Sequence, residues 1–293
     1  MKFNIKHFLS FLFFFTIAIN AQCYREISSG TFHTIAIKND GTLWAWGRND
    51  FGQLGDNTYI GKNLPVQIGS DTDWIKINAG NHHNLAIKSN GTLWAWGWNL
   101  HGQIGDGTNI NKNFPIQIGS GLDWKEISAG NITSMIIKND HSLWAMGFNN
   151  SGQLGDGTTI NRNIPTLITT NINWKKVVEK DYRTVALKSN GTLWTWGSPF
   201  DILQNQIPNF TPIPIGTDND WDKFSIGTRF IIMIKNNQTL WAYGSNSVYG
   251  VLGDGTLIDR FNPVQISTEI TWNKVSCGYN YTIALKNNGT LWG

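Results

Sequence analysis

Short segments in which apolar and polar residues alternate recur along the chain, separated by segments rich in glycine, asparagine and threonine. Such alternation is typical of strands with one buried face. One part of the chain predicts four strands in succession, at residues 74–79, 84–88, 92–96 and 116–118. Between the second and third strands, Asn90 and Gly91 predict a tight turn, because both residues tolerate a positive φ.

This four-strand pattern repeats about every fifty residues, and the repeat decides the architecture. Leu-Trp pairs recur at spacings of 50, 50, 50, 47 and 51 residues, with their tryptophans at Trp44, Trp94, Trp144, Trp194, Trp241 and Trp292. A second aromatic column consists of Tyr24, Trp74, Trp124, Trp174, Trp221 and Trp272. The repeats therefore begin near residues 24, 74, 124, 174, 221 and 272.

An isolated unit of this kind leaves apolar side chains on both of its faces. In the third strand of the second unit, Trp94 and Trp96 lie on one face and Leu93 and Ala95 on the other. Radial packing of successive four-stranded antiparallel units buries both faces, so the sequence predicts an all-β protein with a β-propeller fold. A solenoid is the alternative, but four strands per repeat favour a propeller over a solenoid.

A specific string of residues recurs in most of the repeats. Trp-Ala-Trp-Gly at residues 94–97 is followed by Asn99 and by Gly-Gln-Ile-Gly-Asp-Gly at residues 102–107, and Gly30 and His33 match an earlier part of the same motif. These strings resemble the regulator of chromosome condensation repeat, and the resemblance extends over most of the chain. It implies a propeller, which in this family usually has seven blades.

The chain departs from that repeat in three places. The fourth unit has a Pro-containing segment at residues 198–211 in place of the Gly-rich loop, and the fifth has one extra residue at 247–249. The sixth repeat stops at Gly293, in the middle of a blade. We expect a seven-bladed protein of which this sequence holds six begun blades, truncated in the last. A six-bladed ring with an imperfect seam is the alternative.

Residues 1–21 have the features of an export signal peptide. Lys2 and Lys6 precede an apolar run at residues 8–19, and Ala21 is a small residue at the expected cleavage site. A membrane anchor is the alternative, but it would need about 20 apolar residues, more than this run supplies. We therefore expect cleavage and export.

Export would leave a mature propeller domain of residues 22–293 that is secreted or lies in the periplasm or cell envelope. A lipoprotein anchored at Cys23 is a less favoured alternative, since the small residue that such processing needs before the cysteine is missing. An exported protein is free to form disulfides, and a bridge between Cys23 and Cys277 would join the two ends of a ring. A small buried thiol at Cys277 is the simpler interpretation.

Composition narrows the classes of function. Lys plus Arg number 23 and Asp plus Glu 20, a net charge of +3 that falls to +1 once the two lysines of residues 1–21 are removed. A nearly neutral chain has no electrostatic preference for nucleic acid. After the signal we expect no segment that spans a membrane, and we expect a monomer.

No constellation of residues predicts catalysis, a cofactor or a metal site, and we expect no enzyme activity. One acidic column is explained by turn geometry: Asp56, Asp106, Asp156 and Asp254. His33 and His83 share a column that supplies two metal ligands at best, fewer than zinc sites normally have. A column of lysines before the hairpin turns predicts solvated strand ends: Lys38, Lys88, Lys138, Lys188, Lys235 and Lys286.

Positions that differ between repeats are free to meet a partner, whereas constant columns serve packing. The loops after the third strands supply the candidate partner-binding residues Arg48, Phe51, Trp98, His101, Phe148, Phe200 and Tyr249. A second variable group precedes the second strands and includes Phe32, His82, Ile132, Tyr182, Arg229 and Asn280. At the mouth of the central channel we expect His33, His83, Tyr182, Arg183, Arg229 and Tyr281.

We expect an exported propeller scaffold that binds a protein partner of unknown identity through variable aromatic loops on one face. The resemblance suggests inhibition as one concrete form, because a secreted bacterial propeller of this family inhibits β-lactamase. Exposed tryptophans leave binding of a carbohydrate or of the cell envelope as an alternative. Guanine-nucleotide exchange, the activity of the nuclear member of the family, is a further alternative that export disfavours.

Overall fold

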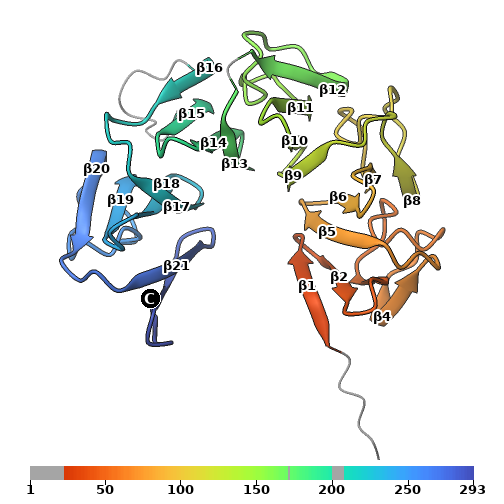
Figure 1. The fold of residues 1–293 in the computed structure, drawn as a ribbon, viewed down its shortest axis with the longest axis horizontal. Helices are drawn as coiled ribbons and strands as arrows, with labels where there is room; N and C mark the ends of the chain where they lie inside the picture. The colour runs from red at the N-terminus through yellow and green to blue at the C-terminus, as the bar shows by residue number, and fades with distance from the viewer. Residues whose placement is uncertain (1–22, 171, 200–207) are drawn as a thin grey trace, which may run out of the picture.

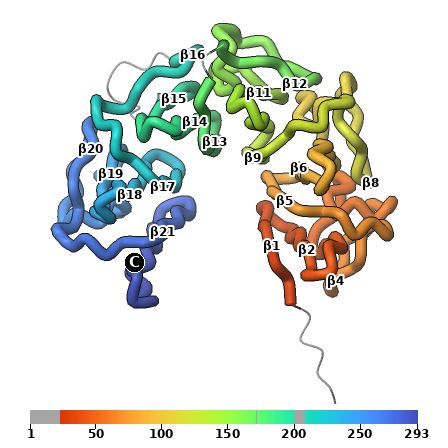
Figure 2. Tube along the Cα trace, viewed as in Figure 1, coloured from red at the N-terminus to blue at the C-terminus, as the bar shows by residue number. Residues whose placement is uncertain are grey.

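The structure is a computed structural model that describes residues 23–170, 172–199 and 208–293. These residues form six sheets, or blades, placed side by side in an arc, with blade 1 at one end and blade 6 at the other (Figures 1 and 2). Five sheets have four strands and the sixth has three, and strands adjacent in sequence are adjacent in each sheet. The predicted all-β propeller with four-stranded antiparallel blades is confirmed.

Within each blade, the strands follow one another in chain order from the inside of the arc to its outside (Figure 1). The first, innermost strands are β1 (Tyr24–Ser29), β5 (Trp74–Ala79), β9 (Trp124–Ala129), β13 (Trp174–Lys180), β17 (Trp221–Ile226) and β21 (Trp272–Cys277). The second strands are β2 (His33–Lys38), β6 (His83–Lys88), β10 (Thr133–Lys138), β14 (Arg183–Lys188), β18 (Phe230–Lys235) and β22 (Thr282–Lys286). The third strands are β3 (Leu43–Gly47), β7 (Leu93–Gly97), β11 (Leu143–Gly147), β15 (Leu193–Gly197), β19 (Leu240–Gly244) and β23 (Leu291–Trp292). The fourth strands are β4 (Lys62–Ile68), β8 (Lys112–Gln117), β12 (Arg162–Thr169), β16 (Asn209–Pro214) and β20 (Arg260–Ser267).

Two details of blade 2 differ from the expectation. Strand β8 begins at Lys112 and contains Pro115, because an outermost strand has an unpaired edge and tolerates a residue without an N–H. In the turn between β6 and β7, only Gly91 has a positive φ, 79°. Asn90 contributes through its side chain, whose Oδ1 accepts hydrogen bonds from the backbone N (3.1 Å) and Oγ1 (2.7 Å) of Thr92.

Apolar cores lie between neighbouring blades. In the core between blades 1 and 2, Trp94 and Trp96 pack together with Leu43 of the preceding blade. On the opposite face of the same strand, Leu93 packs into the core between blades 2 and 3 with Trp124. The predicted alternation along the third strand is therefore confirmed, and one strand serves two cores. Full burial of one such large side chain contributes about 1.5–3 kcal/mol.

Three of the recurring lysines are buried, Lys88, Lys235 and Lys286, and the other three are partly buried, so the expectation of solvated strand ends is wrong. Lys88 is 7% exposed, and its Nζ lies 4.6 Å from the ring centroids of both Trp74 and Trp94. The same ammonium pairs with Asp71 (2.5 Å) and Asp73 (3.1 Å). Two aromatic faces and nearby carboxylates compensate the hydration that the ammonium loses. The arrangement of one lysine between two tryptophans recurs at Lys138, Lys188, Lys235 and Lys286.

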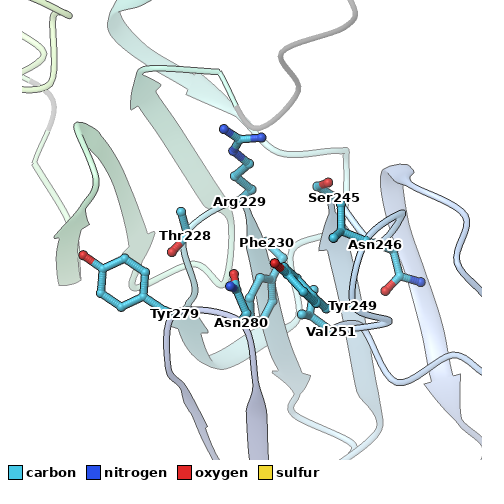
Figure 3. A pocket seen from close by; sticks show the side chains of 10 residues that line it. Thr228, Arg229, Phe230, Ser245, Asn246, Tyr249, Val251, Tyr279 and Asn280 are labelled. Atoms are coloured by element: carbon cyan, nitrogen blue, oxygen red, sulfur yellow. The ribbon is translucent and has the colours of Figure 1, made fainter.

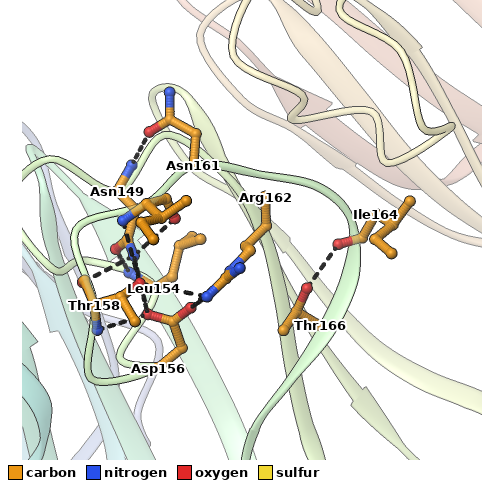
Figure 4. A network of polar contacts seen from close by, with 9 residues as sticks. Asn149, Leu154, Asp156, Thr158, Asn161, Arg162, Ile164 and Thr166 are labelled. Atoms are coloured by element: carbon orange, nitrogen blue, oxygen red, sulfur yellow. Dashed lines mark hydrogen bonds and ion pairs between the residues drawn. The ribbon is translucent and has the colours of Figure 1, made fainter.

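The loop between the third and fourth strands is held by a network of short polar side chains (Figure 4). In blade 3, Asn149 Nδ2 donates to Asp156 Oδ1 (3.0 Å), which also accepts from Thr158 Oγ1 (2.7 Å), while Asp156 Oδ2 pairs with Arg162 (2.7 Å). Burial alone would raise the pKa of Asp156, but hydrogen bonds from Thr158 and Arg162 outweigh it and hold the pKa below its ordinary value. Corresponding bonds at Asp56, Asp106 and Asp254 confirm that the acidic column forms turns.

Three further sequence expectations concern the two cysteines, membrane-spanning segments and the signal peptide. Cys23 is exposed and Cys277 is partly buried, and both are free thiols. Among the described residues, no helix is long and apolar enough to cross a membrane. The predicted signal peptide at residues 1–21 lies outside the described part of the chain, so its cleavage stays a prediction.

Candidate functional site

A backbone hydrogen bond brings the two variable columns of the sequence together on one face of the propeller. In blades 1 to 5, the N–H of the residue after the third strand donates to the carbonyl of the residue before the second strand, at 2.8–3.0 Å. The pairs are Arg48 with Phe32, Trp98 with His82, Phe148 with Ile132, Ser198 with Tyr182 and Ser245 with Arg229. Gly97 (φ 105°) permits this approach in blade 2, because a Cβ there would collide with the His82 carbonyl oxygen. The two groups of residues therefore form one surface.

Seven rings on this surface form what we call the aromatic band. Its members are Phe32, Phe51, His82, Trp98, His101, Phe148 and Tyr182. The ring centroid of Phe51 in blade 1 lies 5.1 Å from that of His82 in blade 2. The centroid of His101 in blade 2 lies 4.8 Å from that of Phe148 in blade 3, which in turn lies 6.0 Å from that of Tyr182 in blade 4. The band thus crosses three blade boundaries through direct ring contacts.

The aromatic band is open to solvent and has a charged edge. Phe32 is 58% exposed and Tyr182 is 42% exposed, while Trp98 is half-buried. The Arg48 guanidinium lies 5.6 Å from the centroid of Phe32 and pairs with Asp50 at 2.5 Å. A partly exposed aromatic group beside an arginine is the composition that interface anchors favour.

The two histidines of the band are neutral at neutral pH. Burial lowers the pKa of His101. Burial also lowers the pKa of His82, and the charge of Arg48 lowers it further, while Asp50 opposes this shift. The band therefore presents uncharged rings between blades 1 and 4.

The structure places the predicted partner-binding residues in separate locations. Four of them belong to the band, namely Phe51, Trp98, His101 and Phe148, and Arg48 lies at its edge. Tyr249 is 67% exposed and lies apart from the band on blade 5, where it lines a pocket. Phe200 lies outside the described residues. The members Phe32 and His82 are variable positions in the sequence, but nothing in the sequence indicates that they join the same cluster.

The residues expected at the channel mouth do not form one site. His33, His83 and Arg183 are buried inside the propeller. His33 Nε2 shares a hydrogen bond with Asn84 Oδ1 (2.8 Å), and His83 Nε2 shares one with Ser134 Oγ (3.0 Å). Burial lowers the pKa of His33 to about 4 and that of His83 to about 3, so both are neutral structural groups. In the part of the chain that the structure describes, no three His, Cys, Asp or Glu side chains are placed to hold a metal ion.

Blade 4 carries charged residues where the other blades have uncharged ones, in the sequence Glu-Lys-Asp-Tyr-Arg at residues 179–183. Glu179 is buried, and its carboxylate accepts hydrogen bonds from the backbone N of Asn131 (2.8 Å) and of Tyr182 (2.9 Å). Burial raises the pKa of Glu179 to about 7. Glu179 is not among the residues predicted from the sequence. The available signal was its place as the one acid in a repeat column that otherwise holds Ser29, Ala79, Ala129, Ile226 and Cys277.

Two cations of the same segment connect blade 4 to blades 5 and 6. Lys180 Nζ donates to the carbonyl oxygens of Cys277 (3.3 Å) and Gly278 (3.1 Å). Arg183 Nη1 donates to the carbonyl oxygen of Thr228 (3.4 Å). Burial lowers the pKa of Lys180, and it lowers the pKa of Arg183 to about 9, which leaves the guanidinium protonated at neutral pH.

A pocket of about 360 Å³ opens between blades 5 and 6 (Figure 3). Its lining includes Thr228, Arg229, Val248, Tyr249, Tyr279 and Asn280. The pocket brings together one predicted channel-mouth residue, Arg229, and one predicted partner-binding residue, Tyr249. Tyr281 is 61% exposed on blade 6 and does not line this pocket.

Fold and repeat together define the class, which is that of β-propellers built from about fifty-residue blades. The family model for the regulator of chromosome condensation (RCC1) repeat matches residues 40–87, 90–137, 140–180 and 238–285. A second model of the same repeat matches residues 24–53 and 74–103. The chain belongs to the regulator of chromosome condensation repeat family.

Curated relatives match single repeats of this chain. The ultraviolet-B receptor UVR8 of Arabidopsis thaliana is 39% identical over 51 residues, which are 17% of this chain and 12% of the receptor. The probable E3 ubiquitin-protein ligase HERC3 of Homo sapiens is 39% identical over 49 residues, 17% of this chain and 4% of the ligase. The chain thus spans only a small part of the length of these relatives.

Solved structures resemble nearly the whole chain. Human WBSCR16 has a TM-score of 0.76 at 19% identity, over 89% of this chain and 71% of that protein. Yeast RCC1 (Prp20), solved with Kap60, has a TM-score of 0.77 at 17% identity, over 91% of this chain and 68% of that protein. At such identities the likeness establishes the fold alone.

Proposed function

We propose that the chain is an exported propeller scaffold that binds a protein partner through the aromatic band. The observation that carries this proposal is the unbroken series of ring contacts across blades 1 to 4. The residues of the band occupy positions that vary between repeats. Packing between blades would require similar side chains in every repeat, so packing does not explain why these rings are present. Clustered, partly exposed aromatic side chains beside an arginine are a typical protein-binding surface.

The family supports a binding role without naming the partner. Yeast Prp20 is described as bound to Kap60 and as having binding properties toward Gsp1p and histones. Those partners are known for the yeast protein, with which this chain shares the fold at 16–17% identity. Guanine-nucleotide exchange is the weaker proposal for this chain, because an exported protein would not meet a cytosolic GTPase.

Export rests on the sequence of residues 1–21, with two lysines before an apolar run. The test is to express the full chain in its source cells, fractionate them and sequence the N-terminus of the recovered protein. Export predicts a mature protein that starts at Gln22 in the periplasmic, envelope or culture fraction. An uncleaved protein confined to the cytosol would contradict it and would bring nucleotide exchange back into consideration.

The partner is sought by affinity capture from envelope and culture fractions with three baits. The first bait is the unaltered protein and the second is the Trp98→Ala, Phe148→Ala variant, which removes two central rings of the band. The third is Phe114→Ala, a matched control that removes an exposed ring (45% exposed) on the outermost strand of blade 2. The proposal predicts a protein that the first and third baits recover and the second does not.

Inhibition is the concrete form of binding that we test once a partner is in hand. If the captured protein is an enzyme, its activity should fall when the unaltered propeller is added and should not fall when the band variant is added. Carbohydrate binding is the second candidate, since exposed rings of the band could also stack on sugar faces. Retention on a polysaccharide column that is lost with Trp98→Ala, together with failure to capture any protein, would favour that candidate and overturn ours.

A further inference from the structure

The pocket between blades 5 and 6 combines an arginine with aromatic and aliphatic walls (Figure 3). Arg229 is exposed, and no described carboxylate forms an ion pair with it. Tyr249 and Tyr279 are 67% and 62% exposed, and Val248 is also exposed beside them. Arg229 and these apolar side chains line the same volume of about 360 Å³.

Two more cations lie behind the walls of this pocket. Arg183 donates to the carbonyl oxygen of Thr228, a lining residue. Lys180 Nζ lies 5.6 Å from the ring centroid of Tyr279, another lining residue. The blade 4 acid that faces both cations is Asp181, whose Oδ1 already accepts a hydrogen bond from an asparagine side chain of blade 3 (2.8 Å).

One of the acids next to the pocket is Asp259, which bonds to the lining residue Asn246. Asp259 Oδ1 accepts hydrogen bonds from the backbone N of Asn246 (2.6 Å) and of Ser247 (2.8 Å) and so fixes the loop that carries Tyr249. Its charge is engaged by these donors rather than by Arg229. Among the described residues, no acid forms an ion pair with Arg229, so the pocket offers the charge of this guanidinium to a ligand, although the whole chain is nearly neutral.

We propose that this pocket binds a carboxylate joined to an apolar group, as presented by an acidic residue next to an apolar one in a protein partner. The planar guanidinium of Arg229 matches a carboxylate through two parallel N–H donors. Tyr249, Tyr279 and Val248 would cover the apolar part. The inference rests on the proposed function only in assigning the ligand to a protein, because the chemistry of the pocket stands without it.

The pocket is tested with small probes on the folded full chain, by ligand-observed saturation-transfer NMR. The carboxylate probe is 3-phenylpropionate, and its neutral counterpart is 3-phenylpropionamide. A third probe, 2-phenylethylphosphonate, distinguishes a carboxylate site from a phosphate site. The protein variants are Arg229→Gln, which keeps the length of the side chain and removes its charge, and Lys125→Gln, a control that removes an exposed charge from the inner strand of blade 3.

The proposal predicts that 3-phenylpropionate binds the unaltered protein and Lys125→Gln equally, and Arg229→Gln at least about tenfold more weakly. The neutral amide should bind the unaltered protein more weakly than the acid does, by a similar factor. Equal binding by Arg229→Gln, equal binding of the amide, or no binding of the acid would overturn it. Tighter binding of the phosphonate by about tenfold or more would replace the carboxylate with a phosphate ester as the ligand.

This titration contains no partner protein, so its failure and the failure of the proposed function are separable. If the probes do not bind but the band still captures a partner, only the proposal about the pocket is refuted. A positive titration with no effect of the Trp98→Ala, Phe148→Ala change on capture refutes the band alone.

Discussion

Replacement of Glu179 by glutamine should change how the stability of the protein depends on pH. The carboxylate is 4% exposed and lies between the N–H groups of Asn131 and Tyr182. Burial raises its pKa from an ordinary 4.5 to about 7, and the charge of Asp181 acts in the same direction, while the two N–H donors oppose the shift. In the unfolded chain the same carboxyl releases its proton near its ordinary pKa.

The sign of the effect follows from the number of bound protons. Between pH 4.5 and pH 7 the folded state holds a proton on Glu179 that the unfolded state has released, so the free energy of unfolding falls as the pH rises. At about 1.36 kcal/mol per pH unit, this interval corresponds to a loss of about 3 kcal/mol by pH 8. The loss is absent below pH 4.5, where the carboxyl is protonated in both states.

The assay is denaturant unfolding at several pH values between 4.5 and 8, followed by tryptophan fluorescence. His33 and His83 complicate a single profile, because burial lowers their pKa and makes stability rise with pH over an overlapping range. The informative quantity is therefore the difference between the unaltered protein and Glu179→Gln. We expect the unaltered protein to lose about 3 kcal/mol relative to the variant from pH 4.5 to pH 8.

A matched control separates this effect from the loss of any carboxylate. Glu126→Gln removes a partly exposed carboxylate from the inner strand of the neighbouring blade 3 and measures what the loss of a carboxylate outside the buried site does to the pH profile. If the profile of Glu179→Gln is parallel to that of the unaltered protein, the carboxylate of Glu179 is ionised in the folded state throughout. Burial would then not raise its pKa.

Three further changes test the packing. Lys88→Met should lower the free energy of unfolding by about 1 kcal/mol more than Lys188→Met does. Both changes remove contacts with two aromatic faces, but only Lys88 also loses ion pairs among the described residues. Equal costs would show that those pairs contribute no stability. Gly130→Ala should destabilise, because the new Cβ would collide with the Glu179 carboxylate, and Glu179→Ala should recover part of the loss; a purely additive double mutant would refute the collision. Asp156→Ala should lower the free energy of unfolding by about 2–3 kcal/mol at pH 7 and by progressively less as the pH falls below 4. The reason is that the pKa of this carboxyl is lowered in the folded state, so its contribution to stability disappears in acid. A cost that does not change with pH in calorimetric or denaturant unfolding would contradict this.

The blades could be predicted from the sequence because each must fill the same boundary. A fixed period forces the same side-chain volume into the same place, so Trp94 and Trp96 mark one face of the third strand and Leu93 the other. The lysine column could not be predicted in the same way. A charged residue before a turn is usually solvated, and the burial of Lys88 depends on how the neighbouring strands β5 and β7 place Trp74 and Trp94 against its ammonium.

The candidate site was only partly predictable for a related reason. Variation between repeats identified Phe51, Trp98 and Phe148, but ring contacts across blade boundaries depend on how loops of different blades meet. His33 and His83 show the opposite error. A histidine column near the channel suggested an accessible mouth, whereas each imidazole fills the space beside a glycine of its own blade and is hydrogen-bonded in the interior.

The central claim is that the aromatic band binds a protein partner. It is tested most directly by titrating a purified captured protein into the unaltered propeller, the Trp98→Ala, Phe148→Ala variant and the Phe114→Ala control, after checking that all three melt alike. We predict equal affinity for the unaltered protein and the control, and a loss of at least about a hundredfold, or about 2.7 kcal/mol, for the band variant. Equal affinity of all three proteins would contradict it and place the binding surface elsewhere on the propeller.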